Sequence, residues 1–305
     1  MDVFVGLVIK YSKGYQIGGS TTSYQSLIQD LIFTDESTQT ISATLTEGKA
    51  FGAGVTSTIV GYHMGGTGND SPFALDEIER LTYSNETTEA ITATISDLRR
   101  LMASVNSTSK GYSMGGYDHL FAPKNTIGEI VFSDESTQDL ASTLNNARTQ
   151  PQGVNSDTKG YAMGGSYTTS FYTWIDDLVF SSGTSTILTA ALDTGTGSGA
   201  SVDTDTKGYV MGGTITGGNS TNRIENLVFA DESSQTISET LTYNTEATGN
   251  GVQSDISGYA MGAGDTSSRS GFIRAFTFST ETKYVCTDTL STAVFGGTGV
   301  QSGFQ

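Results

Sequence analysis

The chain has 305 residues, and Asp and Glu outnumber Lys and Arg by 32 to 15, which gives a net charge of -17. Such an acidic surface disfavours contact with nucleic acid and with anionic lipid. The single cysteine, Cys286, cannot form an internal disulfide. No stretch approaches membrane-spanning length, and residues 1–13 lack the basic region and long apolar core of a signal peptide, so we expect folding in the cytosol.

A string close to Lys-Gly-Tyr-x-Met-Gly-Gly returns six times along the chain. Its Gly-Tyr pairs begin at positions 14, 61, 111, 160, 208 and 258, with gaps of 47, 50, 49, 48 and 50 residues. A period near fifty indicates an array of similar supersecondary units rather than several unrelated domains. We therefore expect residues 1–305 to form a single domain.

The first two strands of each repeat are predicted to form a hairpin, and the fourth repeat shows the pattern clearly. A short strand at 153–156 leads into a turn at 157–160, and a second strand follows at 161–163. Asp157 at the first turn position and Gly160 at the fourth fit a type I turn closed by a left-handed residue. We therefore expect Gly160 to adopt a positive φ, which glycine tolerates without steric cost.

The third and fourth strands of each repeat have different patterns. The third strand carries three apolar residues in a row, as in Leu31-Ile32-Phe33, which predicts burial on both faces. An acidic turn such as Asp35-Glu36-Ser37-Thr38 then leads into an alternating strand such as 40–45, which is typical of an outer strand with one wet face. We interpret the acidic turns as solvated hairpins in which Asp bonds its own backbone, in preference to calcium sites.

Four antiparallel strands in each of six repeats, with no helical periodicity, predict an all-β fold: a six-bladed β-propeller of four-stranded antiparallel blades. The expected blade cores lie near residues 14–45, 54–95, 104–144, 153–192, 201–241 and 251–290.

The end of the chain nearly repeats an earlier first strand, because Gly299-Val300-Gln301-Ser302 resembles residues 251–254. We therefore expect the strand at 299–305 to pair with residues 14–19 and to close the ring. The apolar run at 7–10 competes for the same position by forming a local hairpin. On the preferred alternative, residues 1–12 are left as an extra strand or a partner contact.

These repeats resemble the kelch repeat, whose hallmarks are a hairpin ending in a double glycine, an aromatic residue shortly before it, and a third strand ending in aromatic-Asp. The resemblance spans nearly the whole chain and implies a propeller. Kelch-like propellers include oxidases and sugar-isomerising enzymes. The Trp that kelch repeats usually carry on the fourth strand is absent, since this chain has Thr40-Ile41 or Thr236-Ile237 there.

Variable loops follow each double glycine and connect the blades, and all of them are expected on one face. Loops on a rigid scaffold are where proteins usually place binding residues. The loops of the third and fourth repeats are the richest in aromatic residues, and aromatic and Arg side chains carry much of the energy of partner binding. The candidate binding residues are Tyr117, His119, Phe121, Arg148, Tyr167, Phe171, Tyr172 and Trp174. The alternative is that the aromatic rings pack the mouth of the channel.

The sequence contains no recognisable catalytic arrangement. No Gly-x-Ser-x-Gly elbow follows a predicted strand and precedes a helix, and no His or Cys spacing suggests a metal site. His63 lies on a predicted core strand, and the repeated methionines, such as Met163, read as packing between blades. We therefore expect no catalytic residue, no metal and no cofactor.

A composition rich in Ser, Thr and Gly and poor in Lys and Cys resembles that of bacteriophage virion proteins. This resemblance implies a non-enzymatic structural or attachment protein located in the virion. Its expected partners are other virion proteins or a host-surface glycan or protein, with no nucleic acid and no membrane insertion. The alternatives are a bacterial module that binds a glycan or a protein and, third, a sugar-active enzyme.

Overall fold

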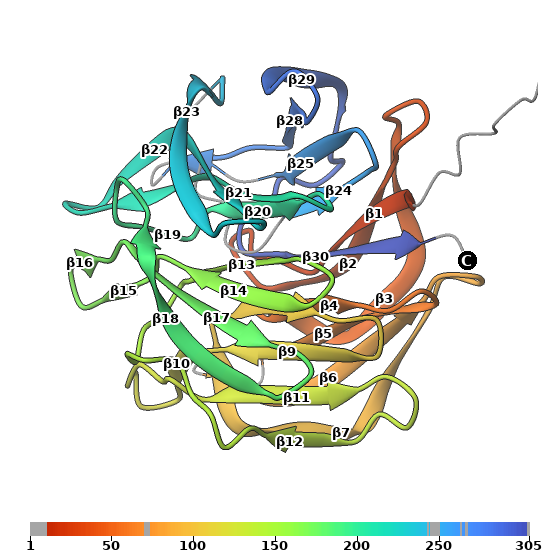
Figure 1. The fold of residues 1–305 in the computed structure, drawn as a ribbon. Coiled ribbons are helices and arrows are strands. Elements are labelled where there is room, and N and C mark those ends of the chain that lie inside the picture. The colour runs from red at the N-terminus through yellow and green to blue at the C-terminus, as the bar shows by residue number, and fades with distance from the viewer. Residues whose placement is uncertain are drawn as a thin grey trace, which may run out of the picture.

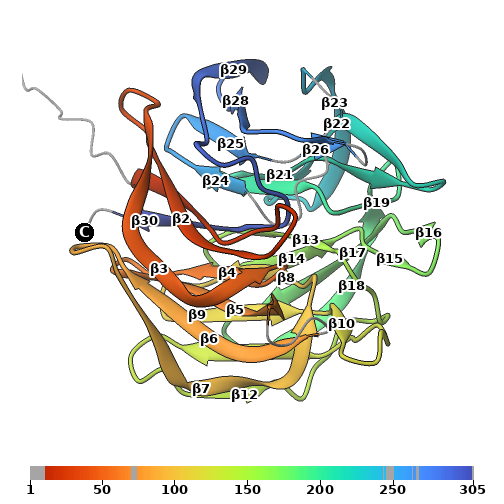
Figure 2. The same ribbon diagram turned by 180° about the vertical axis from the view of Figure 1, so that it is seen from behind.

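A computed structural model describes residues 11–69, 74–242, 244, 251–262, 264–265 and 268–303. These residues form antiparallel sheets and no helix, so they contain no helix suited to crossing a membrane. The sheets are arranged in a propeller-like ring, with short strands near the centre and long strands at the periphery (Figures 1 and 2). The predicted all-β class is confirmed.

The second to sixth repeats each contribute four main strands, and the first contributes three, beside which a C-terminal strand pairs. The first strands, next to the axis, are β30 (Thr298–Gly303), β4 (Ala53–Thr56), β8 (Ala103–Asn106), β13 (Gln152–Asn155), β20 (Ala200–Asp203) and β24 (Gly251–Gln253). The second strands are β1 (Tyr11–Ile17), β5 (Val60–Gly68), β9 (Lys110–Met114), β14 (Lys159–Met163), β21 (Lys207–Ile215) and β25 (Ser257–Met261).

The third and fourth strands lie farther from the axis. The third strands are β2 (Gln25–Ile32), β6 (Leu75–Thr82), β11 (Ile127–Val131), β17 (Trp174–Val179), β22 (Asn219–Val228) and β28 (Phe272–Thr277). The fourth strands are β3 (Thr38–Ala50), β7 (Thr87–Arg100), β12 (Thr137–Asp139), β18 (Thr184–Ala191), β23 (Ser233–Thr240) and β29 (Thr282–Thr289). Short strands in the loops are β10 (Tyr117–Asp118), β15 (Ser166–Tyr167), β16 (Ser170–Phe171), β19 (Thr196–Gly197), β26 (Gly264–Asp265) and β27 (Ser268–Arg269).

The division into separate blades differs from the expected six. The third to sixth repeats each have a sheet of their own, whereas the first two repeats share a nine-stranded sheet. The two repeats are joined because the long strand β3 continues into the next repeat and pairs with β5, with Lys49 opposite Gly68 and Ala50 opposite Thr67. The structure therefore shows four separate blades and one composite sheet.

The C-terminal strand lies beside the first repeat, as predicted. Strand β30 pairs antiparallel with β1, with Tyr15 opposite Val300 and Gln16 opposite Gly299. The competing run at 7–10 and the last two residues, 304–305, lie outside the described residues.

Two aromatic rings meet wherever consecutive repeats pack together. The tyrosine of each Gly-Tyr pair stacks on the aromatic residue that follows the third strand of the next repeat, with ring centroids 5.4–5.7 Å apart. The stacked pairs are Tyr15–Tyr83, Tyr62–Phe132, Tyr112–Phe180, Tyr161–Phe229, Tyr209–Phe278 and Tyr259–Phe33. The last pair joins the sixth repeat to the first, so the same contact recurs around the whole ring.

The glycine of the Gly-Tyr pair has a different role from the predicted one. Gly160 is not among the residues with a positive φ, so the turn prediction is wrong. Instead, a Cβ added to Gly160 would lie 2.4 Å from Cγ2 of Val105 on the first strand of the preceding repeat. Because a valine approaches this glycine in every repeat, the position has no room for a side chain.

Positive φ is found instead in the double glycines and in the acidic turns. Gly164 and Gly165 have φ of 67° and 101°, and the double glycine at the same place in the first three repeats and the fifth is similar. Within the acidic turns, the left-handed residue is a glutamate in five of the six repeats: Glu36, Glu86, Glu135, Glu232 and Glu281. In the fourth repeat Gly183 takes this conformation, with φ of 65°.

The acidic turns form contacts between repeats. The predicted bond of the turn Asp to its own backbone is present, since Asp35 Oδ1 accepts hydrogen bonds from the Ser37 N–H and hydroxyl. The following glutamate is not simply solvated. Glu232, for example, accepts a hydrogen bond of 3.2 Å from the Tyr161 hydroxyl and an ion pair of 2.7 Å from Lys159, both of the preceding repeat. We call this tyrosine–glutamate contact the inter-repeat clamp.

The predicted burial of the third strands is confirmed, but the buried residues begin earlier in the strand than the predicted apolar triplet. Four consecutive residues are buried in β17, Ile175 to Leu178, and β2, β11, β22 and β28 show the same run of four. The middle residue of each predicted apolar triplet is half-buried in these strands, as at Val179. The buried run instead includes acidic residues, and Asp176 and Asp177 are both almost fully buried. These carboxylates are held by hydrogen bonds or ion pairs, which burial requires.

Candidate functional site

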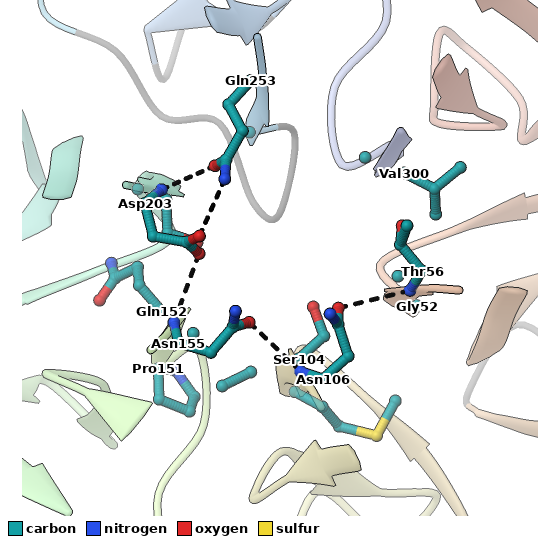
Figure 3. Close-up of a pocket in the computed structure, with 18 of the residues that line it drawn as sticks. Gly52, Thr56, Ser104, Asn106, Pro151, Gln152, Asn155, Asp203, Gln253 and Val300 are labelled. Atoms are coloured by element: carbon teal, nitrogen blue, oxygen red, sulfur yellow. Dashed lines mark hydrogen bonds between the residues drawn. The ribbon is translucent and has the colours of Figure 1, made fainter. Parts of the chain in front are cut away.

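The six first strands surround an axial cavity of about 100 Å³ that is open to solvent. Most of its lining is glycine, hydroxyl or amide, and Asp203 is the only charged residue among the described residues that line it. Figure 3 shows these side chains converging from different strands on one space.

A closed ring of hydrogen bonds encircles this cavity. At each first strand, a backbone N–H is bonded by a side-chain oxygen from the next strand around the axis, over distances of 2.6–3.4 Å. The six members, in order, are Thr56, Asn106, Asn155, Asp203, Gln253 and Gln301, and Thr56 Oγ1 accepts from the Gln301 N–H to complete the circle. We call this set the axial ring. It satisfies the N–H groups of strands that would otherwise present an open edge.

Sequence reasoning missed the axial ring, although a signal was present. All six members occupy the same position of the repeat, two residues after the small residue of the first strand, and all have a side-chain oxygen. Attention to polar residues on an inner strand, where burial favours apolar ones, would have singled them out.

A row of backbone bonds connects the segments where the chain passes from one repeat to the next. The Leu101 N–H bonds the Phe51 carbonyl at 2.8 Å, the Gln150 N–H bonds the Leu101 carbonyl at 2.8 Å, and the Ser198 N–H bonds the Gln150 carbonyl at 3.1 Å. These four residues have φ between 56° and 63°, a strained conformation for a residue with a side chain. The strain is held in place because each linker bonds its neighbour.

The loop of the third repeat exposes apolar side chains, one of which packs against neighbouring residues. Leu120 and Phe121 are 72% and 55% exposed, and the Arg100 guanidinium lies 5.0 Å from the centre of the Phe121 ring. Tyr117 packs edge-on against Phe121, with centroids 6.5 Å apart. The predicted candidates Tyr117 and Phe121 are therefore brought together, while His119 is exposed beside them.

Asp118 fixes the shape of this loop. Its Oδ1 accepts hydrogen bonds from the backbone N–H groups of Leu120 and Ala122, at 2.8 and 2.9 Å, and its Oδ2 pairs with Lys124 at 3.0 Å. Burial by itself raises the pKa of Asp118, but these partners outweigh it and hold the pKa below its usual value. The carboxylate thus stays charged and the loop tip stays ordered across the ordinary pH range.

The candidates of the fourth repeat form a second group. Tyr172 and Trp174 stack face to face with centroids 3.8 Å apart, and both are half-buried. Tyr167 is 47% exposed, whereas the Phe171 ring lies against Gly197, where an added Cβ would be 3.0 Å away. Among the described residues, no ring contact joins this group to the third-repeat loop, so the candidates lie in two groups.

Arg148 is not a surface residue, so its placement among the binding candidates is wrong. It is fully buried, pairs with Asp176 at 2.7 Å, and donates a hydrogen bond to the Ala162 carbonyl at 3.0 Å. Burial lowers the pKa of its guanidinium, and the Asp176 carboxylate opposes that change. Arg99 and Lys49 occupy equivalent buried positions at the ends of β7 and β3. These linker cations hold neighbouring repeats together, a role that their sequence position alone did not reveal.

The remaining titratable candidates lie apart from these surfaces. His63 is fully buried, and desolvation together with the nearby charge of Lys49 lowers its pKa to about 3. Within the described ranges, no group of three or more His, Cys, Asp or Glu side chains is placed to hold a metal ion.

Comparison with known proteins adds no family. No protein-family model matches this chain, and no curated protein matches it significantly. The kelch resemblance and the resemblance to virion proteins therefore remain hypotheses drawn from the residues alone.

Proposed function

We propose that the protein is a non-enzymatic attachment propeller that binds a protein partner through the loop of its third repeat. In this proposal the six repeats act as six blades, and β30 serves as the innermost strand of the first. Two contacts support that role for β30: its pairing with β1, and the approach of Val300 to Gly61, where an added Cβ would lie 2.6 Å from Val300. In each of the remaining repeats, a valine approaches the equivalent glycine in the same way.

The observation that carries the proposal is the exposed pair Leu120 and Phe121. These two apolar side chains are exposed next to each other on a loop that Asp118 orders, and contiguous exposed apolar surface is typical of interaction sites. An ordered loop loses little conformational entropy when a partner covers it. The neighbouring Arg100 adds a cation, so the partner surface should offer an apolar pocket beside an acidic group.

The test replaces both exposed side chains, as Leu120→Ser with Phe121→Ser. Loss of an anchoring aromatic residue typically costs ~2 kcal/mol or more of binding, about a thirtyfold fall in affinity. The melting temperature should be unchanged, because both side chains are exposed. The matched control is Tyr167→Ser, which removes an exposed aromatic ring from the fourth-repeat loop.

The measurement is capture of the natural partner by the tagged protein, followed by binding of each variant to the captured material. Equal binding of the double variant and the wild-type protein would contradict the proposal. Binding that is lost only with Tyr167→Ser would move the surface to the fourth repeat, and binding that glycosidase treatment of the target abolishes would replace a protein partner by a glycan.

We further propose that the partner belongs to a bacteriophage particle or to the host surface that such a particle meets. The composition, rich in Ser, Thr and Gly and with one cysteine, supports this location. Co-sedimentation of the protein with particles from a lysate is the expected result, and recovery only as free protein would contradict it.

A further inference from the structure

We infer that the axial cavity binds a small neutral polyol, such as glycerol, through the side chains of the axial ring. This inference is independent of the proposed attachment function, because it involves the channel and not the third-repeat loop.

Each amide side chain of the axial ring accepts a hydrogen bond from a neighbouring strand through its oxygen. Its NH₂ group is not used in that bond and can donate elsewhere. For Asn106, Asn155 and Gln301, that NH₂ group has no hydrogen-bond partner within the part of the chain that the structure describes, and all three residues line the cavity. Gln253 differs, since its Nε2 donates to Asp203 Oδ1 at 2.8 Å. Three donors therefore converge on the axis from separate blades.

Acceptors and hydroxyl groups face the same space. The Asp203 carboxylate lines the cavity and accepts hydrogen bonds from the Gln253 side chain and, at 3.3 Å, from the Asn155 N–H. The hydroxyl-bearing residues Ser104 and Ser201 also line the cavity. The cavity wall thus has amide donors on some of its strands and the Asp203 carboxylate, an acceptor, on another.

This arrangement selects against charged ligands. An anion would meet Asp203 in a protein of net charge -17. A metal cation requires several oxygen ligands, whereas the cavity offers one carboxylate and the ring oxygens are already engaged by backbone N–H groups. An ammonium group only donates hydrogen bonds, so it could not pair with the three amide donors. A hydroxyl group both donates and accepts, so a polyol pairs with the amide donors and with the acceptor at once.

The size of the cavity limits the ligand to a compact one. The axial cavity has about 100 Å³, which is less than the ~300–1,000 Å³ of typical small-molecule sites. Its wall is also held in shape before binding, because every member of the axial ring is fixed by the next. A pre-formed site avoids the entropic cost of ordering.

The experiment is saturation-transfer NMR with glucose, galactose, mannose and glycerol at millimolar concentration. The informative variant is Asn155→Asp, which keeps an oxygen for the Asn106 N–H and removes the free donor. The matched control is Asn85→Asp, which makes the same charge change in an exposed turn where other repeats already carry Asp.

We expect transfer to at least one probe with the wild-type protein and with Asn85→Asp, and an affinity about tenfold lower with Asn155→Asp, the effect of losing one hydrogen bond. If Asn155→Asp lowers the melting temperature, Gln301→Glu provides the same test from the opposite side of the ring. Absence of transfer from every probe, or equal transfer with the ring variants, would overturn the inference and leave the cavity a water-filled channel. Phe121→Ser should not alter transfer, which separates this site from the attachment surface.

Discussion

Two neighbouring interfaces in the ring differ in the inter-repeat clamp. Between the fourth and fifth repeats, Glu232 clamps the Tyr161 hydroxyl and Lys159. Between the third and fourth repeats, the stacking of Tyr112 on Phe180 is preserved at 5.4 Å, but Gly183 stands where the glutamate would be, and the Tyr112 hydroxyl finds no partner of good geometry. The stacking of aromatic rings is therefore common to both interfaces, whereas the clamp is present in only one of them.

This difference indicates that apolar packing defines the ring and that polar contacts adjust the strength of each interface. If so, disturbing the packing should have a larger effect than removing a clamp, and restoring the missing clamp should have the smallest effect.

The largest effect is expected from Gly160→Val, at the interface that lacks the clamp. The new side chain would overlap Val105, which lies 2.4 Å from an added Cβ, and should lower the free energy of unfolding by about 3 kcal/mol or more. The control is Gly218→Val, where φ is 75° and no atom lies within 4 Å, so that only backbone strain of ~1–3 kcal/mol applies. Urea denaturation measures both; equal stability losses would show that close approach is not what fixes the glycine.

The next effect is a pH dependence of stability that comes from the second repeat. The variable position of the repeated string is His63 in the second repeat and Gln16 in the first, and both are fully buried. Since the His63 pKa is about 3 in the folded protein and ~6.5 in the unfolded chain, only the unfolded chain binds this proton between those values. The free energy of unfolding should therefore fall as pH drops below ~6.5, by up to ~1.4 kcal/mol per pH unit.

Replacing this histidine, as His63→Gln, should remove that part of the slope, whereas His119→Gln, at the exposed histidine, should keep it. Denaturation at pH 6.5, 5.5 and 4.5 gives the comparison, with a difference of ~2–3 kcal/mol across the range. Parallel curves for the wild-type protein and His63→Gln would rule out the buried neutral histidine.

A smaller effect is expected from Glu232→Ala, which removes a clamp. The Tyr161 hydroxyl and Lys159 each lose a partner, at a cost of ~1–2 kcal/mol, since the pair is partly screened by solvent. In a Tyr161→Phe background the cost should shrink, because one of the stranded groups is gone. A cost unchanged by that background would show that the tyrosine contact contributes nothing.

The smallest effect is expected from adding the missing clamp. Gly183→Glu and Gly183→Ala pay the same backbone strain at φ of 65°, but only the glutamate gives the Tyr112 hydroxyl a partner. Gly183→Glu should be the more stable of the two by ~1 kcal/mol. The difference should vanish with Tyr112→Phe, and a difference that persists there would point to some other partner.

Much of the fold could be predicted from the repeat. The Gly-Tyr spacing, the apolar third strand and the alternating fourth strand predict the antiparallel strands of each unit, and the last residues predict the pairing of β30 with β1. The prediction for Gly160 chose the right residue for the wrong reason, because a sequence does not show which neighbour approaches a glycine.

The candidate sites were less predictable. Tyr117 and Phe121 were found because exposed aromatic residues stand out in a variable loop, but Arg148 was misplaced because a linker cation looks the same in sequence whether it is exposed or buried. The division into two clusters also depends on how far apart two loops are held.

By itself, the sequence determined the local elements of this protein: strands, turns and the repeat that makes every unit alike, since these depend on residues close together in the chain. Only the tertiary structure decided what happens between units. The clamp, the buried linker cations and the axial ring each join residues from different repeats, typically around fifty positions apart. No local pattern encodes such contacts, because they exist only once the sheets are packed around a common axis.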